Sequence, residues 1–226
     1  GAQVETLIHS PEVNKVKELL EYGKGVVKMI TLAPEVCSKE IIALISSYDV
    51  IVSAGHSHAK YSEAMNAFSN GISAVTHLYN AMSGLHHRDT GLVGAAFEDS
   101  HVMASIIPDG HHVDWPAIRI AKKIMKERLF AITDAVTTTT EGYYRHSAAG
   151  DRYEANGVLS GSSLTMQKAL QNLVNHAGIE LGEALRMCSL YPAKVLRMQD
   201  ELGLIKKGLR ASLVVLNDNL EIVSII

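Results

Sequence analysis

The sequence predicts an α/β protein built on a parallel β-sheet, and three observations support this fold class. Apolar runs alternate with helix-like segments along the first 135 of the 226 residues. Each apolar run is nearly continuous, which is typical of parallel strands buried on both faces. The run ends recur at intervals of one βα unit, since His56 lies 21 residues after Glu35 and 21 before His77. Five such units predict either a βα barrel or an open doubly wound sheet.

The individual elements follow from apolar runs, caps and prolines. One helix is expected to begin with Ser10 as N-cap and Pro11 at its first position, and another with Ser38 as N-cap. Pro116 falls near the first turn of the helix after the fourth strand. The five predicted strands cover Val26–Glu35, Asp49–Ser57, Ile72–Asn80, His101–Gly110 and Arg128–Ala135.

The pattern changes after Ala135. Residues 137–157 are polar and rich in Gly, Ser and Thr, which predicts a loop with a small hairpin. Two helices are expected over 162–178 and 181–198, the second interrupted before Pro192. The first of these takes Ser162 or Ser163 as its cap, unless the LSGSS segment instead presents backbone N–H groups to a ligand. Residues 212–226 alternate like a pair of antiparallel strands.

Composition excludes several classes of protein. The chain has 21 basic and 24 acidic residues, a net charge of −3 and no long block of either sign, so no nucleic-acid or anionic membrane partner is expected. No apolar run approaches the roughly 18 residues of a membrane span, and no signal peptide is recognised. Cys37 and Cys188 match no metal-binding spacing, which favours free thiols in a reducing compartment. A cytoplasmic location is expected.

Three polar residues stand where apolar strands end, namely His56, His77 and Asp134. Strand ends of a parallel α/β fold share one rim, where sites are built. Two adjacent histidines are able to bind one Zn²⁺ or Fe²⁺, and a carboxylate is able to take the proton of metal-bound water. The alternative for each residue is an ordinary polar strand end or a hydrogen-bonded core histidine.

Two loops offer further candidates. Asn80 and Arg88 flank a polar loop and are suited to holding a phosphate, although Arg88 fits a solvated loop residue equally well. The PDGHHVD segment, Pro108–Asp114, is a turn at the fourth strand end that either caps the next helix or contributes two histidines to a site.

The sequence resembles the N-acetylglucosamine-6-phosphate deacetylases of the amidohydrolase superfamily. The segments that carry the resemblance are TLAPE, VSAGHSHA, THLYNAM, GLVGAAF, PDGHHVD, TDA, LSGSSLTM and YPAKVLRM. The resemblance implies a (βα)₈ TIM-type amidohydrolase barrel, present here as a partial barrel of about five βα units plus the start of a C-terminal small β domain. Residues 1–200 are then the C-terminal portion of the metal-dependent hydrolase barrel, and residues 201–226 are part of the small β domain.

The resemblance also implies a reaction. The acetamide of N-acetyl-D-glucosamine 6-phosphate is hydrolysed to D-glucosamine 6-phosphate and acetate, a step of amino-sugar catabolism. The implied cofactor is a divalent metal ion; Zn²⁺ is expected, with Fe²⁺, Co²⁺ and Mn²⁺ as alternatives. The implied assembly is a homodimer.

The family's residue roles carry over position by position. His56 and His77 match the two histidine metal ligands, and Asp134 matches the aspartate that is first base and then acid. His112 matches the histidine that contacts the substrate and polarises its carbonyl. The other implied substrate-binding residues are Ala2, Gln3, Asn80, Ala81, Arg88, Asp109, Gly110, His111, Leu159, Ser160 and Gly161. Among these, Asn80 and Ala81 match the phosphate site, Arg88 an arginine that reaches the neighbouring subunit's site, and 159–161 the loop that closes on the sugar.

The chain departs from the family pattern in two places. The third protein ligand of the family is a glutamate in an HLEGP motif, which this sequence lacks, and Gln3 stands where a phosphate-contacting histidine is usual. The chain is therefore expected to begin just after the missing glutamate, and by itself to bind metal weakly with little or no activity. The polar stretch that begins with Thr137–Thr140 is the second departure.

Other functions are weighed against this one. Within enzymes, the alternatives are a deacetylase of a related N-acetylated amino sugar phosphate and a cyclic-amide hydrolase, and THLYNAM with LSGSS argues against the latter. The alternative outside enzymes is a non-catalytic sugar-phosphate binding protein. A proton-transfer residue such as Asp134 weighs against it, because binding alone needs none.

Overall fold

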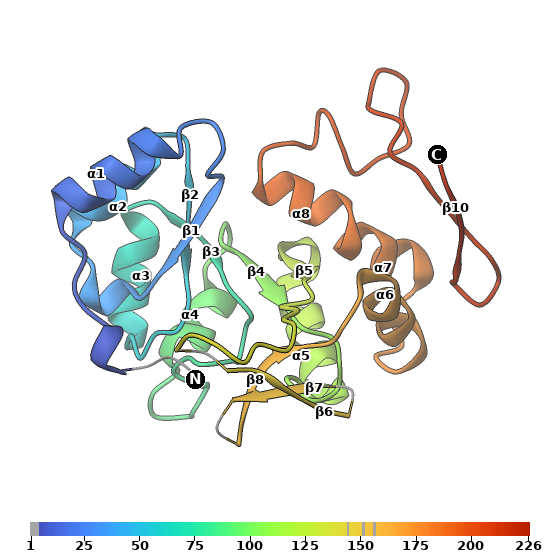
Figure 1. Cartoon of the computed structure of the whole chain (residues 1–226), viewed down its shortest axis with the longest axis horizontal. Coiled ribbons are helices and arrows are strands. Elements are labelled where there is room, and N and C mark those ends of the chain that lie inside the picture. Colours follow the sequence, from blue (N-terminus) through green and yellow to red (C-terminus); the bar gives the residue numbers. More distant parts are fainter. Residues whose placement is uncertain (1–4, 144, 151, 156) are drawn as a thin grey trace. The chain divides into compact units, whose positions relative to one another are not determined.

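A parallel sheet of five strands organises the first part of the chain (Figure 1). The computed structural model describes residues 5–143, 145–150, 152–155 and 157–226, so the predicted site residues Ala2 and Gln3 lie outside the described residues. The strands are β1 (Met29–Leu32), β2 (Ile51–Ala54), β3 (Ile72–Val75), β4 (Met103–Ile106) and β5 (Leu129–Ala131), in the order β1-β2-β3-β4-β5. Each lies inside its predicted range, and the parallel α/β prediction is confirmed.

The chain divides into two units, and the first ends at Ser105. Its helical segments are η1 (Glu5–Leu7), α1 (Val13–Tyr22), η2 (Pro34–Val36), α2 (Lys39–Ser47), α3 (Tyr61–Ser69) and α4 (Gly91–Glu98). Helices α1 to α3 lie on one side of β1, β2 and β3 (Figure 1). Buried aliphatic side chains of α2, the strands and α4 fill the space between these layers, among them Ile41, Ile45, Val52, Ile72 and Leu92. This apolar core fixes the strand ends that carry the site.

One predicted helix cap of this unit is confirmed and one is wrong. The Ser38 side chain accepts a hydrogen bond from Ile41 N at the start of α2, as predicted. Helix α1 begins at Val13 with Glu12 as its N-cap, rather than with Ser10 as cap. The reason is that the first helical hydrogen bond runs from Val16 N to Glu12 O.

The second unit runs from Ile106 to Ile226. Its helices are α5 (Trp115–Met125), η3 (Lys126–Arg128), α6 (Met166–Asn175), α7 (Leu181–Cys188) and α8 (Leu190–Val195). A three-stranded antiparallel sheet contains β6 (Ser147–Ala149), β7 (Arg152–Ala155) and β8 (Val158–Ser162), and a separate antiparallel pair contains β9 (Val214–Leu216) and β10 (Ile222–Ile225). The predicted hairpin and the predicted terminal strand pair are confirmed.

Helix boundaries in this unit follow local chemistry. Pro116 lies in the first turn of α5, as predicted. The cap of α6 is Thr165, whose side chain accepts from Lys168 N, so the prediction of Ser162 or Ser163 is wrong. Ser162 is a residue of β8 instead. The predicted interruption before Pro192 occurs at Ser189, which has φ −138° and separates α7 from α8.

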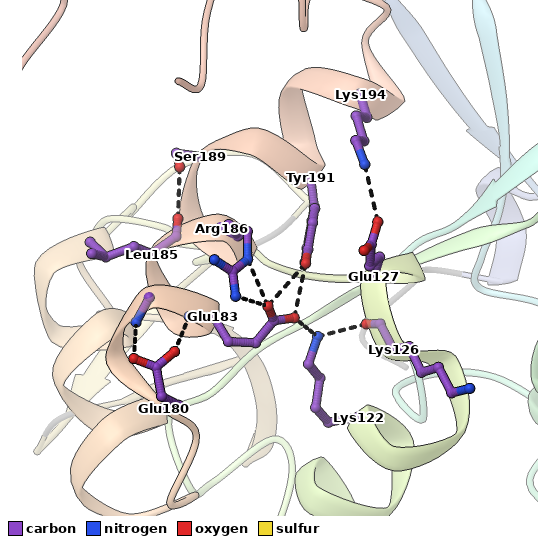
Figure 2. Close-up of polar contacts among 11 residues, drawn as sticks. Lys122, Lys126, Glu127, Glu180, Glu183, Leu185, Arg186, Ser189, Tyr191 and Lys194 are labelled. Atoms are coloured by element: carbon purple, nitrogen blue, oxygen red, sulfur yellow. Dashed lines mark hydrogen bonds and ion pairs between the residues drawn. The ribbon is translucent and has the colours of Figure 1, made fainter. Parts of the chain in front are cut away.

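A polar cluster ties three helices of the second unit together, and we call Lys122, Glu183, Arg186 and Tyr191 the Glu183 cluster. Figure 2 shows the Glu183 carboxylate of α7 facing Lys122 of α5 and Tyr191 of α8. Arg186 donates to Glu183 Oε2 at 2.6 Å, and the Tyr191 hydroxyl lies 3.0 Å from each carboxylate oxygen. Because Tyr191 is only 1% exposed, its hydroxyl needs a hydrogen-bond partner among the packed helices, and Glu183 provides it.

Two expectations from composition concern cysteines and membranes. Cys37 and Cys188 are free and half-buried, and burial raises the pKa of the Cys188 thiol to about 12. Over the described residues, no helix combines the length and the apolar character needed to cross a membrane. The assignment of residues 201–226 to a small β domain stays a prediction.

Candidate functional site

Two histidines meet at the carboxyl ends of neighbouring parallel strands. His56 follows β2, which ends at Ala54, and His77 follows β3, which ends at Val75. Their Nε2 atoms lie 2.9 Å apart, and their rings are inclined at 76°. His77 is 4% exposed, whereas His56 is exposed. The structure thus brings together the two side chains that the sequence pairs as metal ligands.

Both histidines adopt a backbone conformation that most residues avoid. The φ angles are +48° at His56 and +38° at His77, in the left-handed region where strain often accompanies function. The buried Ser105 side chain accepts a hydrogen bond from His77 N at 2.8 Å and holds this conformation. A Cβ on Gly55 would lie 2.8 Å from Thr31 Cγ2, so the residue before His56 has to be small.

The facing imidazoles fit a divalent metal ion as two of its ligands. Nitrogens bound to one tetrahedral Zn²⁺ at roughly 2.0–2.1 Å lie about 3.3 Å apart, which small ring rotations reach from the observed 2.9 Å. Imidazole nitrogen is also a suitable ligand for Fe²⁺. No group of three or more His, Cys, Asp or Glu that is suited to a metal occurs among the residues described here. His56 and His77 thus present two facing imidazole nitrogens that fit a divalent ion, and their role as metal ligands stays a prediction.

The chain after His77 forms a tight, half-buried loop that contains Asn80 and Ala81. Ala81 has φ +49°, and Asn80 N donates to His77 O at 2.9 Å. Ala81 O accepts from Ser57 N at 3.0 Å, so this loop is bound to the segment that carries His56. The predicted phosphate residues consequently lie on the same rim of the sheet as the histidine pair.

Arg88 lies on an exposed hairpin rather than against the histidine pair. His86 and Asp89 exchange backbone hydrogen bonds of 3.0 and 3.1 Å across this hairpin. Arg88 Nε donates to His87 Nε2 at 3.2 Å. An exposed guanidinium at such a position is compatible with the predicted reach to a neighbouring subunit, which stays a prediction.

In the second unit, Asp109 and His112 form a closely hydrogen-bonded pair. His112 Nδ1 lies 2.6 Å from Asp109 Oδ2, and Asp109 Oδ1 accepts from the backbone N–H groups of His111 and His112. Burial raises the pKa of the Asp109 carboxyl, but these hydrogen bonds outweigh burial and place it below its ordinary value. Gly110 has φ +79°, and a Cβ there would lie 2.5 Å from Trp115. The turn therefore fixes the His112 ring while leaving its Nε2 for other partners.

Asp134 lies beyond the carboxyl end of β5, also with a positive φ of +49°. Asp134 is an exposed residue, and its backbone carbonyl oxygen accepts a hydrogen bond from Ser162 N at 2.9 Å. The Ser162 hydroxyl donates to Thr133 O. Gly161 has φ +75°, and a Cβ there would lie 2.5 Å from Val136 Cγ1 and 3.1 Å from Asp134 O. The Asp134 turn is thus held by close backbone packing.

The predicted substrate loop at Leu159, Ser160 and Gly161 is part of a strand. All three residues belong to β8, because this segment pairs antiparallel with β7. The loop prediction is wrong in form, although the segment does lie beside the Asp134 turn. Ser160 is 6% exposed, and its Oγ lies 3.1 Å from His146 Nδ1.

Three residues that hold the histidine segments by hydrogen bonds, namely Glu35, Ser57 and Ser105, were not predicted from the sequence. Glu35 accepts hydrogen bonds from Ser57 Oγ and His58 N, and Ser105 accepts from His77 N. Glu35 and Ser57 stand inside the TLAPE and AGHSHA segments, which was the available signal. Ser105 stands in an apolar strand without any such signal.

The Amidohydrolase family model matches residues 8–225. The chain is 33% identical over 231 residues to an N-acetylgalactosamine-6-phosphate deacetylase of Escherichia coli O157:H7, an alignment that covers 98% of this chain and 61% of that protein. The chain therefore spans about three fifths of the length of this curated relative.

Solved structures agree with this comparison. The N-acetylglucosamine-6-phosphate deacetylase of Pasteurella multocida superposes with a TM-score of 0.95 at 32% identity, over 100% of this chain and 62% of that chain. A mutant of the Mycobacterium smegmatis N-acetyl-D-glucosamine-6-phosphate deacetylase, in complex with N-acetyl-D-glucosamine-6-phosphate, gives 0.93 at 30% identity, over 100% and 63% of the two chains. The predicted partial (βα)₈ barrel is confirmed as the fold class.

Proposed function

The chain belongs to the amidohydrolase family, and we propose that it carries the metal-binding histidines and the proton-transfer aspartate of a deacetylase for N-acetylated amino-sugar 6-phosphates. The predicted family resemblance is confirmed by this match. The observation that carries the proposal is the pair of Nε2 atoms of His56 and His77, 2.9 Å apart at adjacent strand ends. The two nitrogens lie within hydrogen-bond distance of each other, and a divalent ion held by both imidazoles would take the place of that contact.

Each residue has a defined task in the proposed hydrolysis. His56 and His77 hold the metal ion, which when bound acidifies water and polarises the acetamide carbonyl. Asp134 takes a proton from the attacking water and delivers a proton to the amine nitrogen as the C–N bond breaks. The products are the free amino sugar phosphate and acetate.

His112 is assigned to the carbonyl oxygen of the acetamide. When both ring nitrogens are protonated, Nδ1–H donates to Asp109 and Nε2–H is left to donate to that oxygen. The lowered pKa of Asp109 keeps its carboxylate charged, so that Asp109 Oδ2 accepts the hydrogen bond from His112 Nδ1–H. Gly110 and His111 belong to the same turn, and His111 N–H also binds Asp109.

The sugar phosphate is assigned to the loop after β3. Asn80 Nδ2 and the backbone of Ala81 offer hydrogen-bond donors, and Arg88 of a second copy completes the charge in a homodimer. Leu159, Ser160 and Gly161 are assigned to the sugar, with Ala2 and Gln3 as further contacts. Zn²⁺ is the proposed metal, with Fe²⁺, Co²⁺ and Mn²⁺ as alternatives, and the proposed location is the cytoplasm.

The substrate has two candidates within one chemical class. N-Acetyl-D-glucosamine 6-phosphate is favoured by the motifs and by the two solved relatives. N-Acetylgalactosamine 6-phosphate is favoured by the Escherichia coli relative at 33% identity. Since the two sugars differ only at C4, the phosphate and acetamide contacts assigned above serve both.

The proposal is tested on the whole protein in three measurements. Elemental analysis is expected to find about one or two divalent ions per chain, and acetate release is expected from one or both sugar phosphates. Asp134→Asn is expected to abolish turnover and retain the metal. Turnover that survives in this variant would remove Asp134 from its role, and a metal-free protein that binds the sugar phosphate without releasing acetate would establish the binding-protein alternative.

The 226-residue chain by itself is expected to bind Zn²⁺ weakly and to show little turnover. Two imidazole ligands are fewer than the three protein ligands of typical catalytic zinc sites. Normal turnover by this chain alone would contradict that expectation.

A further inference from the structure

We propose that Glu35 and Ser57 act together as positioning residues for His56 and for the phosphate loop, an inference that rests on the proposed function. Glu35 lies in η2, just after β1. Its Oε2 accepts from Ser57 Oγ at 2.7 Å, and its Oε1 accepts from His58 N at 2.6 Å. One carboxylate just beyond the end of β1 therefore holds Ser57 and His58, the two residues that follow His56. We call these two hydrogen bonds the Glu35 clamp.

The clamp is needed because the backbone of His56 adopts a left-handed conformation that a non-glycine residue disfavours. A non-glycine residue at φ +48° relaxes unless its surroundings hold it. The two amides that follow are both fixed, since Ser57 N donates to Ala81 O at 3.0 Å and His58 N donates to Glu35. Rotation of the His56 backbone to a negative φ would break both hydrogen bonds. The clamp therefore stabilises the backbone conformation in which His56 Nε2 faces His77.

The same clamp extends to the loop after β3. Ser57 is fully buried, and its carbonyl oxygen accepts from Ser83 N at 3.0 Å while its N–H binds Ala81 O. The Ser57 hydroxyl also accepts from Ala59 N at 3.0 Å, and Ser83 Oγ donates to Ala59 O at 2.5 Å. Ser57 is therefore shared by the segment that presents His56 and the segment that contains Ala81. Loss of Glu35 is expected to loosen both.

The expected effects differ between two substitutions of Glu35. Groups that orient metal ligands from outside the coordination sphere typically change metal affinity by about 10–100-fold when removed. Glu35→Ala is expected to raise the Kd for Zn²⁺ by about this factor and to raise KM for the sugar phosphate. Glu35→Gln is expected to keep the Kd for Zn²⁺ within about 10-fold of the wild-type value. Its amide oxygen still accepts from His58 N, and its amide nitrogen donates to Ser57 Oγ.

Glu63 provides a matched control. Its Oε2 accepts from Lys60 N at 2.8 Å, which is the same kind of carboxylate-to-backbone contact only two residues beyond His58. This contact begins α3 and touches neither His56 nor the Ala81 loop. Glu63→Ala is therefore expected to leave the Zn²⁺ affinity within about twofold of the wild-type value, whatever it does to stability.

The experiment combines two readouts. Isothermal titration of Zn²⁺, with the visible absorption of the Co²⁺-loaded form, measures the metal site of the whole protein. Amide hydrogen exchange in the whole protein after removal of the metal measures the clamp without metal, and Glu35→Ala is expected to speed exchange at His58 and Ser83 at least tenfold.

The outcomes separate the two proposals. Wild-type protein that binds none of Zn²⁺, Fe²⁺, Co²⁺ and Mn²⁺ overturns the proposed function and this role with it. Normal wild-type binding with an unchanged Kd in Glu35→Ala, or unchanged exchange at Ser83, overturns the positioning role alone. Equal losses in Glu35→Ala and Glu63→Ala also overturn it, because they would reveal a general structural effect.

Discussion

The Glu183 cluster allows a quantitative prediction about stability. Figure 2 shows that Glu183 of α7 accepts from Lys122 of α5, and the two side chains are 21% and 14% exposed. Replacement of Glu183 by Gln keeps the shape of the side chain and an oxygen acceptor for Tyr191. The substitution removes the negative charge, however, so the nearly buried Lys122 ammonium loses its counter-ion.

The expected loss follows from the degree of burial. Exposed ion pairs contribute about 0–1 kcal/mol, whereas breaking a buried pair by removing one partner costs about 3–5 kcal/mol. At the observed exposures, Glu183→Gln is expected to lower the free energy of unfolding by about 2 kcal/mol. For a chain of this size, that loss lowers Tm by about 4–8 °C.

The effect also depends on pH. Partial burial raises the pKa of Glu183, but hydrogen bonds from Lys122, Arg186 and Tyr191 outweigh it and hold the pKa below its ordinary value of 4.5. A lowered folded-state pKa gives stability that is fully present above about pH 4.5 and is lost as the pH falls through the folded-state pKa. The stability difference between wild type and Glu183→Gln is thus expected to be constant near neutrality and to shrink in acid.

The assay is thermal or urea unfolding followed by circular dichroism between pH 3 and 7. Glu127→Gln is the control, since Glu127 pairs with Lys194 at 3.2 Å but is 71% exposed. This control is expected to change Tm by less than about 2 °C. If Glu183→Gln loses no more stability than Glu127→Gln, or if its deficit persists unchanged at pH 3, the reasoning about this cluster is refuted.

Three further predictions concern the site. Gly161→Ala should destabilise the protein by about 1–3 kcal/mol in urea unfolding, because φ is +75° and the new Cβ would lie 2.5 Å from Val136. Ser105→Ala should cost about 1–3 kcal/mol and speed hydrogen exchange of the His77 amide, which loses its acceptor. Asp109→Asn should remove stability that the wild type shows above about pH 3.8 and loses in acid, measured by unfolding against pH. An equal stability of variant and parent would contradict each.

The strands were predictable because buried strands such as β2 leave a continuous apolar run in the sequence. Their order was not, since the pattern fitted both a barrel and a doubly wound sheet. The Ser38 cap and the Pro116 position were predictable for a similarly local reason, since each depends on a few neighbouring residues. The cap at Ser10 was wrong because a competing first hydrogen bond forms at Glu12, and sequence alone does not rank such neighbours.

The β8 segment was mispredicted for a different reason. Leu159–Gly161 contains small, polar residues that are typical of loops, yet it forms a strand because β7 provides hydrogen-bond partners on one side. Gly161 then lies beside the Asp134 turn because its neighbour Ser162 donates its N–H to Asp134 O and forms a parallel bridge with Ala135. The contact with the distant Asp134 turn has no local signal, whereas the pairing of β7 with β8 has one, because the Asn-Gly sequence at 156–157 is typical of a two-residue hairpin turn.

The sequence by itself determined the family, through motifs such as THLYNAM and LSGSSLTM, and the parallel sheet, through its apolar runs. The metal-ligand and proton-transfer roles of the residues at the strand ends stay predictions. The sequence also paired His56 with His77, since neighbouring parallel strands end on one rim. Only the tertiary structure decided how these side chains are held. The left-handed backbone at His56, its clamp by Glu35 and Ser57, and the support of His77 by Ser105 depend on hydrogen bonds between segments that are far apart in sequence.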